Sequence, residues 1–578
     1  LDHTAKIWDL KTGEITGLIP GPASGSVSIS PDGRLLATGG LHGEATVWET
    51  ATRQPVKTLS KGNPEAWQGA FVRFTPDGRS LAVGIHDRVT LWETGTWKQL
   101  WETDIPLKSF SLTNLVMPEP DSPQGIQEMT FSPDGKMLAL STDGFAGVFN
   151  AANGDQLYTI GGGGMSSLMD LAISGFGREA GSSPAMMNNP FDLHNQVAGL
   201  RYIKTLSFSP TGHLLFSVGI MGKQFWETDS GKPAHIRLGS RTPTTDPKEA
   251  VKGMQINMSR GAAFSPDGKV VAYSHGRLIK FIDLSSGEER EPWSGHTSDI
   301  SSMVYSPDGR FLVSGAKDGT IRLWDAQTGK EQVSLIAIGR EDYAAVTPDQ
   351  YYRLSKNRIK GVAFRANGTL YPFDQFDLRF NRPDIILERL GQSSPDLIQS
   401  YRQAYEKRLK KMGLTQDMLG NDFHLPEVEI LTKSIPVSVT TPELSIRVKA
   451  ADSQYALNRL NVFVNDIPVY GTGGIKLPSG KISSHEQDVN VPLVPGRNKV
   501  QVSVINQQGT ESLRQTVYTQ FSAGNISQDI YVLAIGVSHY QDTAYNLRYA
   551  AKDANDLANV YQAIESQAGT NARVHILR

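Results

Sequence analysis

Cysteine is absent from the 578-residue chain. Without a thiol the chain can form no disulfide, no thiolate zinc site and no cysteine nucleophile. The sequence also has no uninterrupted apolar run of the roughly 18 to 20 residues that a membrane-spanning helix needs. Neither sign of charge is in excess, because 57 Lys and Arg residues balance 59 Asp and Glu residues. No overall field therefore draws the chain to nucleic acid or to an anionic membrane.

Several motifs that carry chemistry are missing as well. There is no His-Glu-x-x-His zinc helix, no Gly-x-Ser-x-Gly elbow and no calcium loop, and the 12 histidines are scattered singly. The four glycines at 161–164 are not followed by Lys-Ser/Thr, and Gly480-Lys481 is followed by Ile482, so neither fits a phosphate-binding loop. We therefore expect no metal and no cofactor.

A turn tetrapeptide recurs six times in the first 310 residues. Its proline fixes φ at the second turn position and its glycine supplies a positive φ two residues later, which predicts a tight hairpin turn. The copies begin at Ser30, Thr75, Ser132, Ser209, Ser265 and Ser306. An apolar residue and a polar one follow each proline by 16 or 17 residues, at Trp48-Glu49, Trp92-Glu93, Phe149-Asn150, Trp226-Glu227, Ile282-Asp283 and Trp324-Asp325. Alternation with period two between these anchors predicts antiparallel strands.

This unit of about forty residues resembles the WD40 repeat, which has four strands per propeller blade. The resemblance covers residues 1–340 and implies a β-propeller of seven blades, with eight as the alternative. Residues 5–9 are similar to the third strand of a blade whose first half is missing, and residues 347–365 suggest a degenerate last unit or closing strands. In the most complete unit, the family's structural hydrogen-bonding set would be His296, Ser314, Asp318 and Trp324.

A propeller has no chemistry of its own and offers a rigid rim of loops, so we expect a protein partner there. Insertions at 101–125, 161–200 and 234–258 would decorate that rim, and the second contains four methionines, an adaptable composition. Residues 371–383 combine aromatic and basic side chains. No wider basic patch accompanies them, so an extended connector is favoured over a nucleic-acid surface.

The remainder of the chain predicts further domains. Apolar residues recur with helical spacing at 384–390 and 395–412. We therefore expect residues 341–425 to contain the degenerate blade or closing strands and a helical linker. Short β-branched runs separated by turns make residues 426–523 a β-sandwich similar to immunoglobulin-like modules, with a spacer or docking role. The whole is expected to be multidomain and mostly β.

Residues 528–578 predict the beginning of an α/β fold. The apolar run 531–536 is typical of a strand buried on both faces of a parallel sheet, and an apolar helical stripe and a second strand at 574–577 complete a βαβ unit. Two segments resemble the start of a caspase-type, metacaspase-like domain of peptidase family C14. They are Leu-Ala-Ile-Gly-Val-Ser-His-Tyr at 533–540 and Leu-Arg-Tyr-Ala-Ala-Lys-Asp-Ala at 547–554.

That resemblance implies a catalytic His and Cys beyond Arg578, so the chain as given has no dyad and is expected to be inactive. Gly536, His539, Arg548 and Asp553 match the family's opening motif. His539 is favoured as a loop residue without catalytic role. For Arg548 and Asp553, a place in a substrate pocket and a role in helix capping both stay open.

Three functions remain open from the sequence. The favoured one is a fragment of a bacterial caspase-family cysteine endopeptidase that cuts proteins and whose propeller recruits or senses a protein partner. The alternative is a non-catalytic WD40 scaffold with a degenerate peptidase domain. A third, an α/β domain that binds a nucleotide, has no glycine fingerprint in its favour. We expect a soluble protein without nucleic-acid partner or membrane span, and the choice between cytoplasm and export stays open.

Overall fold

The computed structural model divides into two compact units, Leu1–Tyr405 and Glu406–Arg578, and the division falls within one helix. The residues it describes are 4–20, 26–63, 69–105, 125–142, 145–160, 203–219, 222–234, 236, 260–355, 363–366, 369–371, 376–412, 414–419, 424–478, 480, 482–522, 530–540, 543, 546–567 and 574–577. The expected insertion at 161–200 and most of those at 101–125 and 234–258 lie outside them. No helix in the described ranges is long and apolar enough to cross a membrane.

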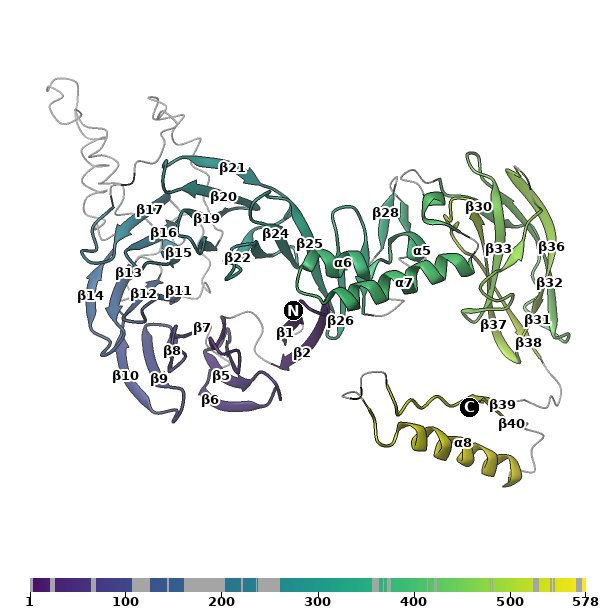
Figure 1. Ribbon diagram of the computed structural model, residues 1–578, viewed down its shortest axis with the longest axis horizontal. Helices are drawn as coiled ribbons and strands as arrows, with labels where there is room; N and C mark the ends of the chain where they lie inside the picture. The colour runs from purple at the N-terminus through teal and green to yellow at the C-terminus, as the bar shows by residue number, and fades with distance from the viewer. Residues whose placement is uncertain are drawn as a thin grey trace, which may run out of the picture. The chain divides into compact units, whose positions relative to one another are not determined.

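Among the described residues of the first unit, seven antiparallel sheets follow one another around a ring (Figure 1). Three sheets span the first 104 residues: β1 (Thr4–Asp9) with β2 (Glu14–Pro20); β3 (Val27–Ile29), β4 (Leu35–Gly39), β5 (Glu44–Glu49) and β6 (Pro55–Lys61); and β7 (Ala70–Phe74), β8 (Ser80–Ile85), β9 (Arg88–Glu93) and β10 (Gln99–Asp104). Strands that are neighbours in sequence are neighbours in each sheet, so every sheet is a meander.

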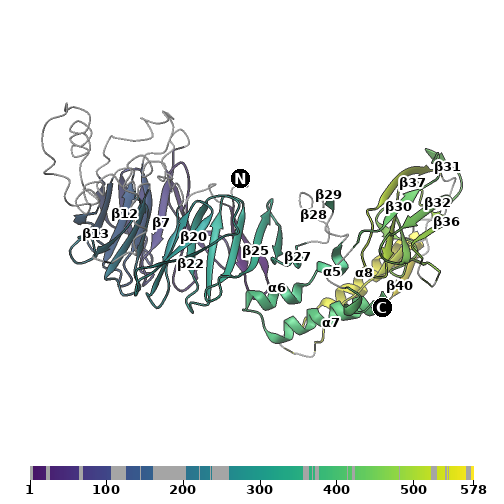
Figure 2. The ribbon, with the colours of Figure 1, turned by 90° about the horizontal axis from the view of Figure 1, so that it is seen from above.

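Four further sheets complete the ring. They are β11 (Ile126–Phe131), β12 (Met137–Thr142), β13 (Phe145–Asn150) and β14 (Gln156–Thr159); β15 (Ile203–Phe208), β16 (Leu214–Gly219) and β17 (Gly222–Glu227); β18 (Ala262–Phe264), β19 (Val270–His275), β20 (Leu278–Asp283) and β21 (Glu289–Trp293); and β22 (Ile300–Tyr305), β23 (Phe311–Ala316), β24 (Thr320–Asp325), β25 (Glu331–Ile338), β26 (Asp342–Val346) and β27 (Tyr352–Leu354). Figure 2 shows the strands running across the thickness of the ring.

The recurrent turn folds locally because its own side chains satisfy its backbone. Ser30 Oγ donates to Asp32 Oδ1 at 2.6 Å and accepts from the N–H of Leu35 at 2.9 Å, while Gly33 has φ 72°. The Ser30 hydrogen bond lowers the pKa of Asp32 below its usual value, so the carboxylate stays ionised at neutral pH. The same Ser/Thr-to-Asp hydrogen bond recurs at 75–77, 132–134, 265–267 and 306–308.

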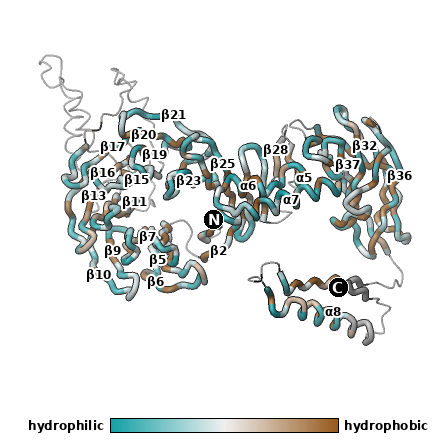
Figure 3. The backbone as a smooth tube through the Cα atoms, viewed as in Figure 1, coloured by the Kyte–Doolittle hydropathy of each residue, from teal (hydrophilic) through white to brown (hydrophobic). Residues whose placement is uncertain are grey.

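Neighbouring blades pack through these turns and through apolar clusters. A β-carbon placed on Gly78, Gly135, Gly212, Gly268 or Gly309 would lie 3.1 to 3.7 Å from Cδ of the proline in the preceding turn. Between the sheets lie buried clusters, for example Val47, Val72, Phe74 and Leu81 between the second and third sheets. Figure 3 shows these apolar stretches interspersed with polar ones along the strands.

The β1–β2 hairpin lies between the sheet of β3–β6 and the sheet of β22–β27. On one side Ile7 and Ile19 pack with Leu36. On the other side Trp8 contacts the ring of Tyr343 edge-on at 5.2 Å, and further apolar groups of the neighbouring sheet surround it. The hairpin thus occupies a seventh position in the ring.

The segment expected to be a degenerate unit or closing strands does not form a separate four-stranded blade in the described residues. β26 and β27 extend the sheet of β22–β25, whereas β28 (Phe364–Ala366) and β29 (Thr369–Tyr371) form their own pair. The aromatic connector packs inward, with the ring of Phe364 5.1 Å from Phe376 and 5.7 Å from Phe380.

Three helices follow this connector, and the second lies on the ring. They are α5 (Asp377–Phe380), α6 (Pro383–Leu390) and α7 (Pro395–Lys411). Ile386, Leu387 and Leu390 of α6 are fully buried in one cluster with Leu335 of β25. Before α6, Arg382 donates to both carboxylate oxygens of the buried Asp384, at 2.9 and 2.7 Å. A short 3-10 helix, η3 (Gln416–Met418), comes after α7.

The second unit contains a two-sheet β-structure. One sheet has the order β30-β32-β36 and the other β31-β38-β37-β33-β34, with β35 beside β33. The strands are β30 (Glu427–Ile430), β31 (Ser438–Val439), β32 (Glu443–Ala451), β33 (Leu457–Val464), β34 (Ile467–Pro468), β35 (Ile475–Lys476), β36 (Ser484–Pro492), β37 (Gly496–Asn506) and β38 (Gln515–Phe521). Residues of both sheets, among them Val448, Val491 and Val502, share one buried core.

The last described segment is a small parallel unit. β39 (Ile530–Leu533) and β40 (Val574–Leu577) pair in parallel with Ile530 opposite Val574, and α8 (Ala550–Gln567) connects them. The expectation that residues 531–536 are buried on both faces is wrong for this structure, since Leu533 is 63% and Ile535 75% exposed. The physical reason is that β39 has one described neighbouring strand and one helix.

Candidate functional site

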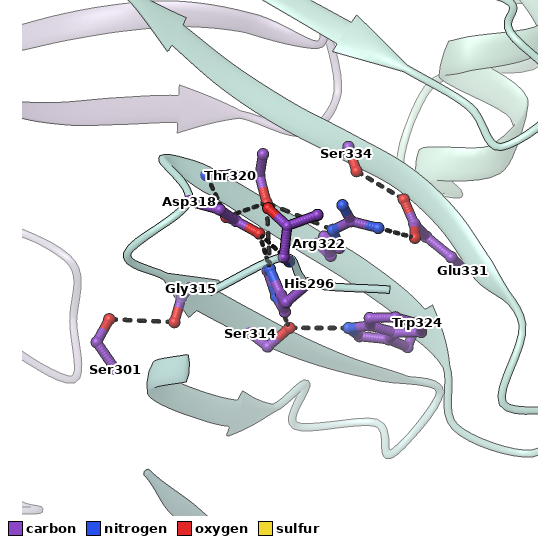
Figure 4. A network of polar contacts seen from close by, with 11 residues as sticks. His296, Ser301, Ser314, Gly315, Asp318, Thr320, Arg322, Trp324, Glu331 and Ser334 are labelled. Carbon is purple, nitrogen blue, oxygen red and sulfur yellow. Dashed lines mark hydrogen bonds and ion pairs between the residues drawn. The ribbon is translucent and has the colours of Figure 1, made fainter. Parts of the chain in front are cut away.

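A polar network joins three strands of the β22–β27 sheet to the loop before β22 (Figure 4). Nδ1 of His296 lies 3.0 Å from Oδ2 of Asp318, and Nε2 of His296 lies 2.8 Å from Oγ of Ser314. Nε1 of Trp324 donates to the same Ser314 oxygen at 2.8 Å. The structure therefore brings together His296, Ser314, Asp318 and Trp324, the four residues that the WD40 resemblance implies.

The protonation states follow from these contacts. Burial lowers the pKa of His296, although Asp318 pulls it upward, so the ring is neutral at neutral pH. Burial alone would raise the pKa of Asp318, but the N–H of Thr297 and the hydroxyl of Thr320 outweigh it and hold that pKa well below its usual range. One tautomer satisfies every group: Trp324 donates to Ser314, Ser314 donates to Nε2 of His296, and Nδ1–H donates to Asp318.

Other blades carry only part of this network. Nε1 of Trp48 donates to Oγ1 of Thr38 at 2.9 Å, and Nε1 of Trp226 donates to Oγ of Ser217 at 2.8 Å. In the β22–β27 sheet the side chains of His296 and Asp318 are 0% and 6% exposed. Since all their polar atoms are satisfied inside the blade, the network fixes the geometry of the sheet and offers no group to a substrate.

Sequence reasoning missed a charged cluster on the inner strands of the ring. Nη2 of Arg73 donates to Oε1 of Glu128 at 3.1 Å, and Nε of Arg73 donates to the carbonyl of Met129 at 3.0 Å. Arg260 donates to the side chain of Gln127 across 133 residues of sequence. Burial raises the pKa of Glu128 even though Arg73 pulls it down. No spacing rule could have found partners that are this far apart.

A second missed cluster joins β17 to β19 and β21. Nζ of Lys223 donates to Oη of Tyr273 at 3.0 Å, Oη of Tyr273 donates to Oε1 of Glu289 at 3.0 Å, and Lys223 also pairs with Glu289. Burial lowers the pKa of Lys223 to about 8, and the nearby Lys280 acts in the same direction. Each of the three groups has a partner, so the cluster ties two blades together.

The C-terminal motif residues lie on and beside the first turn of α8. A β-carbon on Gly536 would lie 2.1 Å from the carbonyl oxygen of Ala550, so the loop passes directly against the start of the helix. Asp553 lies in the first helical turn, and Arg548 stacks on its neighbour Tyr549 with Cζ 5.1 Å from the ring centre. His539 is in the loop after β39. Among the described residues, no hydrogen bond or ion pair joins the side chains of His539, Arg548 and Asp553 to one another.

A metal centre is not formed by the part of the chain that the structure describes, where no group of three or more His, Cys, Asp or Glu side chains could hold an ion. The charged clusters around Arg73 and Lys223 pair cations with single carboxylates. What the described geometry offers is a ring of sheets in which the His296 network and the Lys223 cluster satisfy their own polar groups.

Comparison with known proteins identifies the repeat. The family model described as "WD domain, G-beta repeat" matches residues 14–49 and 287–325. The chain is 25% identical over 242 residues to the serine-threonine kinase receptor-associated protein of Mus musculus, covering 34% of this chain and 65% of the relative. It is also 22% identical over 338 residues to the Arabidopsis thaliana protein "Cell division cycle 20.1, cofactor of APC complex". This match covers 56% of this chain and 60% of the relative.

A third relative is the small ribosomal subunit protein RACK1 of Neurospora crassa, which is 35% identical over 92 residues, or 15% of this chain and 29% of the relative. The chain spans less than two thirds of the length of each of these three relatives. The prediction of WD40 repeats from turn and tryptophan spacing is confirmed by these matches. The first unit of the chain carries WD40 repeats.

Proposed function

We propose that the WD40 ring is a non-catalytic platform that binds a protein partner. The observation that carries this is the ring itself: its polar networks are satisfied internally, and its repeated sheets hold the connecting loops on a rigid frame. The names of two relatives, a receptor-associated protein and a cofactor of a complex, also describe proteins that act through other proteins.

The two faces of the ring differ in how much of their surface is available for recognition. Successive meander connections lie at opposite ends of a sheet, so the recurrent Ser/Thr-Pro-Asp-Gly turns form one face and the next connections form the other. On the first face the turn side chains bond within each copy and pack on the neighbouring copy. On the other face the connections carry different exposed charges, such as Asp87, Arg277 and Lys317. That varied face suits specific recognition.

The experiment compares charge reversals on the two faces. Full-length protein is used as bait for its partner, and captured proteins are quantified by mass spectrometry. Arg277→Glu with Lys317→Glu should reduce capture of the partner at least tenfold. The matched control, Arg79→Glu with Lys136→Glu, reverses two basic residues on the turn face and should leave capture unchanged. Equal loss for both pairs, or no stoichiometric partner at all, would refute the platform.

A second candidate is that the parent protein is a caspase-type cysteine endopeptidase of the kind that carries WD40 repeats in bacteria, with the propeller recruiting or sensing a partner. The parallel β39–α8–β40 unit supports it, because such a unit opens doubly wound folds, and the exposed apolar side chains of Leu533 and Ile535 suit a larger sheet. Gly536 at the tight approach to α8 also fits the motif.

The test of this candidate is the gene itself and its product. The candidate predicts that the gene continues beyond the codon for Arg578. The additional residues should form further strands of the parallel sheet and include a His and a Cys, each after a later strand. The complete product should cleave a labelled protein substrate, and replacing that cysteine by alanine should abolish cleavage while partner capture persists. A gene without this His and Cys would eliminate the peptidase and leave the platform intact.

A further inference from the structure

One end of the β-sandwich in the second unit brings three polar residues together. β30 and β32 pair antiparallel with Glu427 opposite Ala451, so the segment before β30 lies beside the segment that follows β32. His424 comes from the first segment, and Asp452 and Ser453 come from the second. A short motif cannot reveal this cluster, because 28 residues separate the histidine from the aspartate.

The three side chains form a continuous series of hydrogen bonds. Oγ of Ser453 lies 3.2 Å from Nε2 of His424, and Nδ1 of His424 lies 2.9 Å from Oδ1 of Asp452. The N–H groups of Gln454 and Tyr455 also donate to Oδ1 of Asp452, so this oxygen acts as an acceptor. The tautomer that satisfies every group has a proton on Nδ1 of His424, and its Nε2 then accepts from the Ser453 hydroxyl.

A buried amide holds the aspartate and the histidine in place. Nδ2 of Asn506 donates to Oδ2 of Asp452 at 2.8 Å and to the carbonyl oxygen of His424 at 3.0 Å. The side chain of Asp452 is 0% exposed, and Asn506 is fully buried as well. Asp452 is therefore a positioning residue, because it fixes the imidazole of His424 from the interior of the module.

Exposure increases along this series of hydrogen bonds. Asp452 is buried, the side chain of His424 is 32% exposed, and Ser453 lies at the surface. Among the residues that the structure describes, Nε2 of His424 is the one hydrogen-bond partner of the Ser453 hydroxyl. Acyl transfer requires this combination of an accessible hydroxyl and a histidine base that a third group orients.

The ring contains a sealed version of the same arrangement. His296 also lies between a serine, Ser314, and an aspartate, Asp318, and its two ring nitrogens contact them in the same order. There the serine is fully buried and also accepts from Nε1 of Trp324. Of the two clusters, the one in the β-sandwich leaves its serine open to another molecule.

We propose that Ser453, His424 and Asp452 form a hydrolytic site, separate from the proposed platform and from any peptidase domain. Oγ of Ser453 attacks the carbonyl carbon of an ester while its proton passes to Nε2 of His424. The bond from that carbon to the leaving oxygen breaks, and the leaving alcohol takes the proton from Nε2. A water molecule then gives a proton to Nε2 and attacks the acyl-serine, which releases a carboxylic acid as the proton returns to Oγ.

The surroundings of the serine specify the substrate class. The two N–H groups that follow it, those of Gln454 and Tyr455, both donate to Asp452 and so are not available to an oxyanion. A missing oxyanion donor lowers kcat by about 100- to 1,000-fold. Hydrolysis of amides and peptides is therefore not expected. Aryl esters fit the site, because their leaving group departs without such assistance.

A fluorophosphonate probe tests the nucleophile. The probe forms a phosphorus–oxygen bond to a reactive serine and releases fluoride, and mass spectrometry of the digested chain identifies the labelled residue. We expect the adduct on Ser453 and none on the sealed Ser314. His424→Gln should slow the labelling of Ser453 at least tenfold. The matched control is Ser445→Ala, which removes an exposed serine of β32 and should leave labelling of Ser453 unchanged.

Turnover of 4-nitrophenyl acetate tests the complete reaction. Ser453→Ala should lower kcat at least a hundredfold, whereas Ser445→Ala should not change it. Asp452→Asn should lower kcat at least tenfold with KM unchanged, because the imidazole loses its orienting carboxylate. Circular dichroism melting measures the folded fraction of each variant. A purely structural aspartate would lower the melting temperature and leave kcat of the folded protein intact, and that result would overturn the role of Asp452.

The remaining outcomes decide the proposal as a whole. It is overturned if Ser453 is labelled no faster than Ser445 in the wild-type chain, or if the labelling rate survives His424→Gln. It is also overturned if Ser453→Ala retains the hydrolysis, since the imidazole alone would then attack the ester. None of these results bears on the platform, whose partner capture is measured with variants of the ring.

Discussion

The hydroxyl of Ser314 holds two buried groups, and its removal gives a stability change with a predictable sign and size. In Ser314→Ala, Nε1–H of Trp324 loses its acceptor and Nε2 of His296 loses its donor, at sites where Ser314 is fully buried. An unsatisfied buried polar group costs about 1 to 3 kcal/mol. With two such groups, and with partial relaxation of the surrounding structure, the free energy of unfolding should fall by about 2 to 4 kcal/mol.

The blade of β11–β14 offers a control in which the same substitution has the opposite consequence. Oγ of Ser141 is also fully buried, but it has no hydrogen-bond partner. Ser141→Ala removes an unsatisfied hydroxyl and should be neutral or slightly stabilising. Differential scanning calorimetry of the full chain should show a melting transition of the ring lowered by several degrees for Ser314→Ala only. Equal shifts for both variants would refute the assignment of the network's energy to its hydrogen bonds.

Three further outcomes are expected. Because burial depresses the pKa of His296 below 6.5 in the folded state, the unfolded chain binds the extra proton first. Stability should then fall as pH drops below about 6.5, with a slope of up to about 1.4 kcal/mol per pH unit, and His296→Gln should flatten this part of the melting-temperature profile. Arg382→Met leaves the carboxylate of Asp384 buried without its bidentate partner and should lower the free energy of unfolding in denaturant by about 3 to 5 kcal/mol. The double variant Arg382→Met with Asp384→Leu removes that carboxylate and must be more stable than Arg382→Met alone, even if it does not reach the wild-type stability. Gly536→Ala forces a β-carbon against the start of α8 and should raise hydrogen exchange in that helix, whereas Gly473→Ala, which meets nothing within 4 Å, should leave it unchanged.

The repeats could be predicted from the sequence because their signals are local. The Ser-x-Asp hydrogen bond spans only two residues. Each turn also requires a positive φ at its glycine, and glycine at that position is visible in the sequence itself. The pairing of Trp324 with Ser314 spans ten residues inside one meander, so a family pattern captures it. For the same reason the helices at 383–390 and 395–411 fell within a residue of their predicted bounds.

Contacts between blades could not be predicted from any spacing rule. Arg73 and Glu128 are 55 residues apart, and Arg260 and Gln127 are 133 apart, so only the packing of blades against one another places them together. Exposure was unpredictable for a related reason. The pattern of residues 531–536 indicates what the strand could bury, but actual burial depends on how many strands lie beside it, and β39 has only β40 in the described chain.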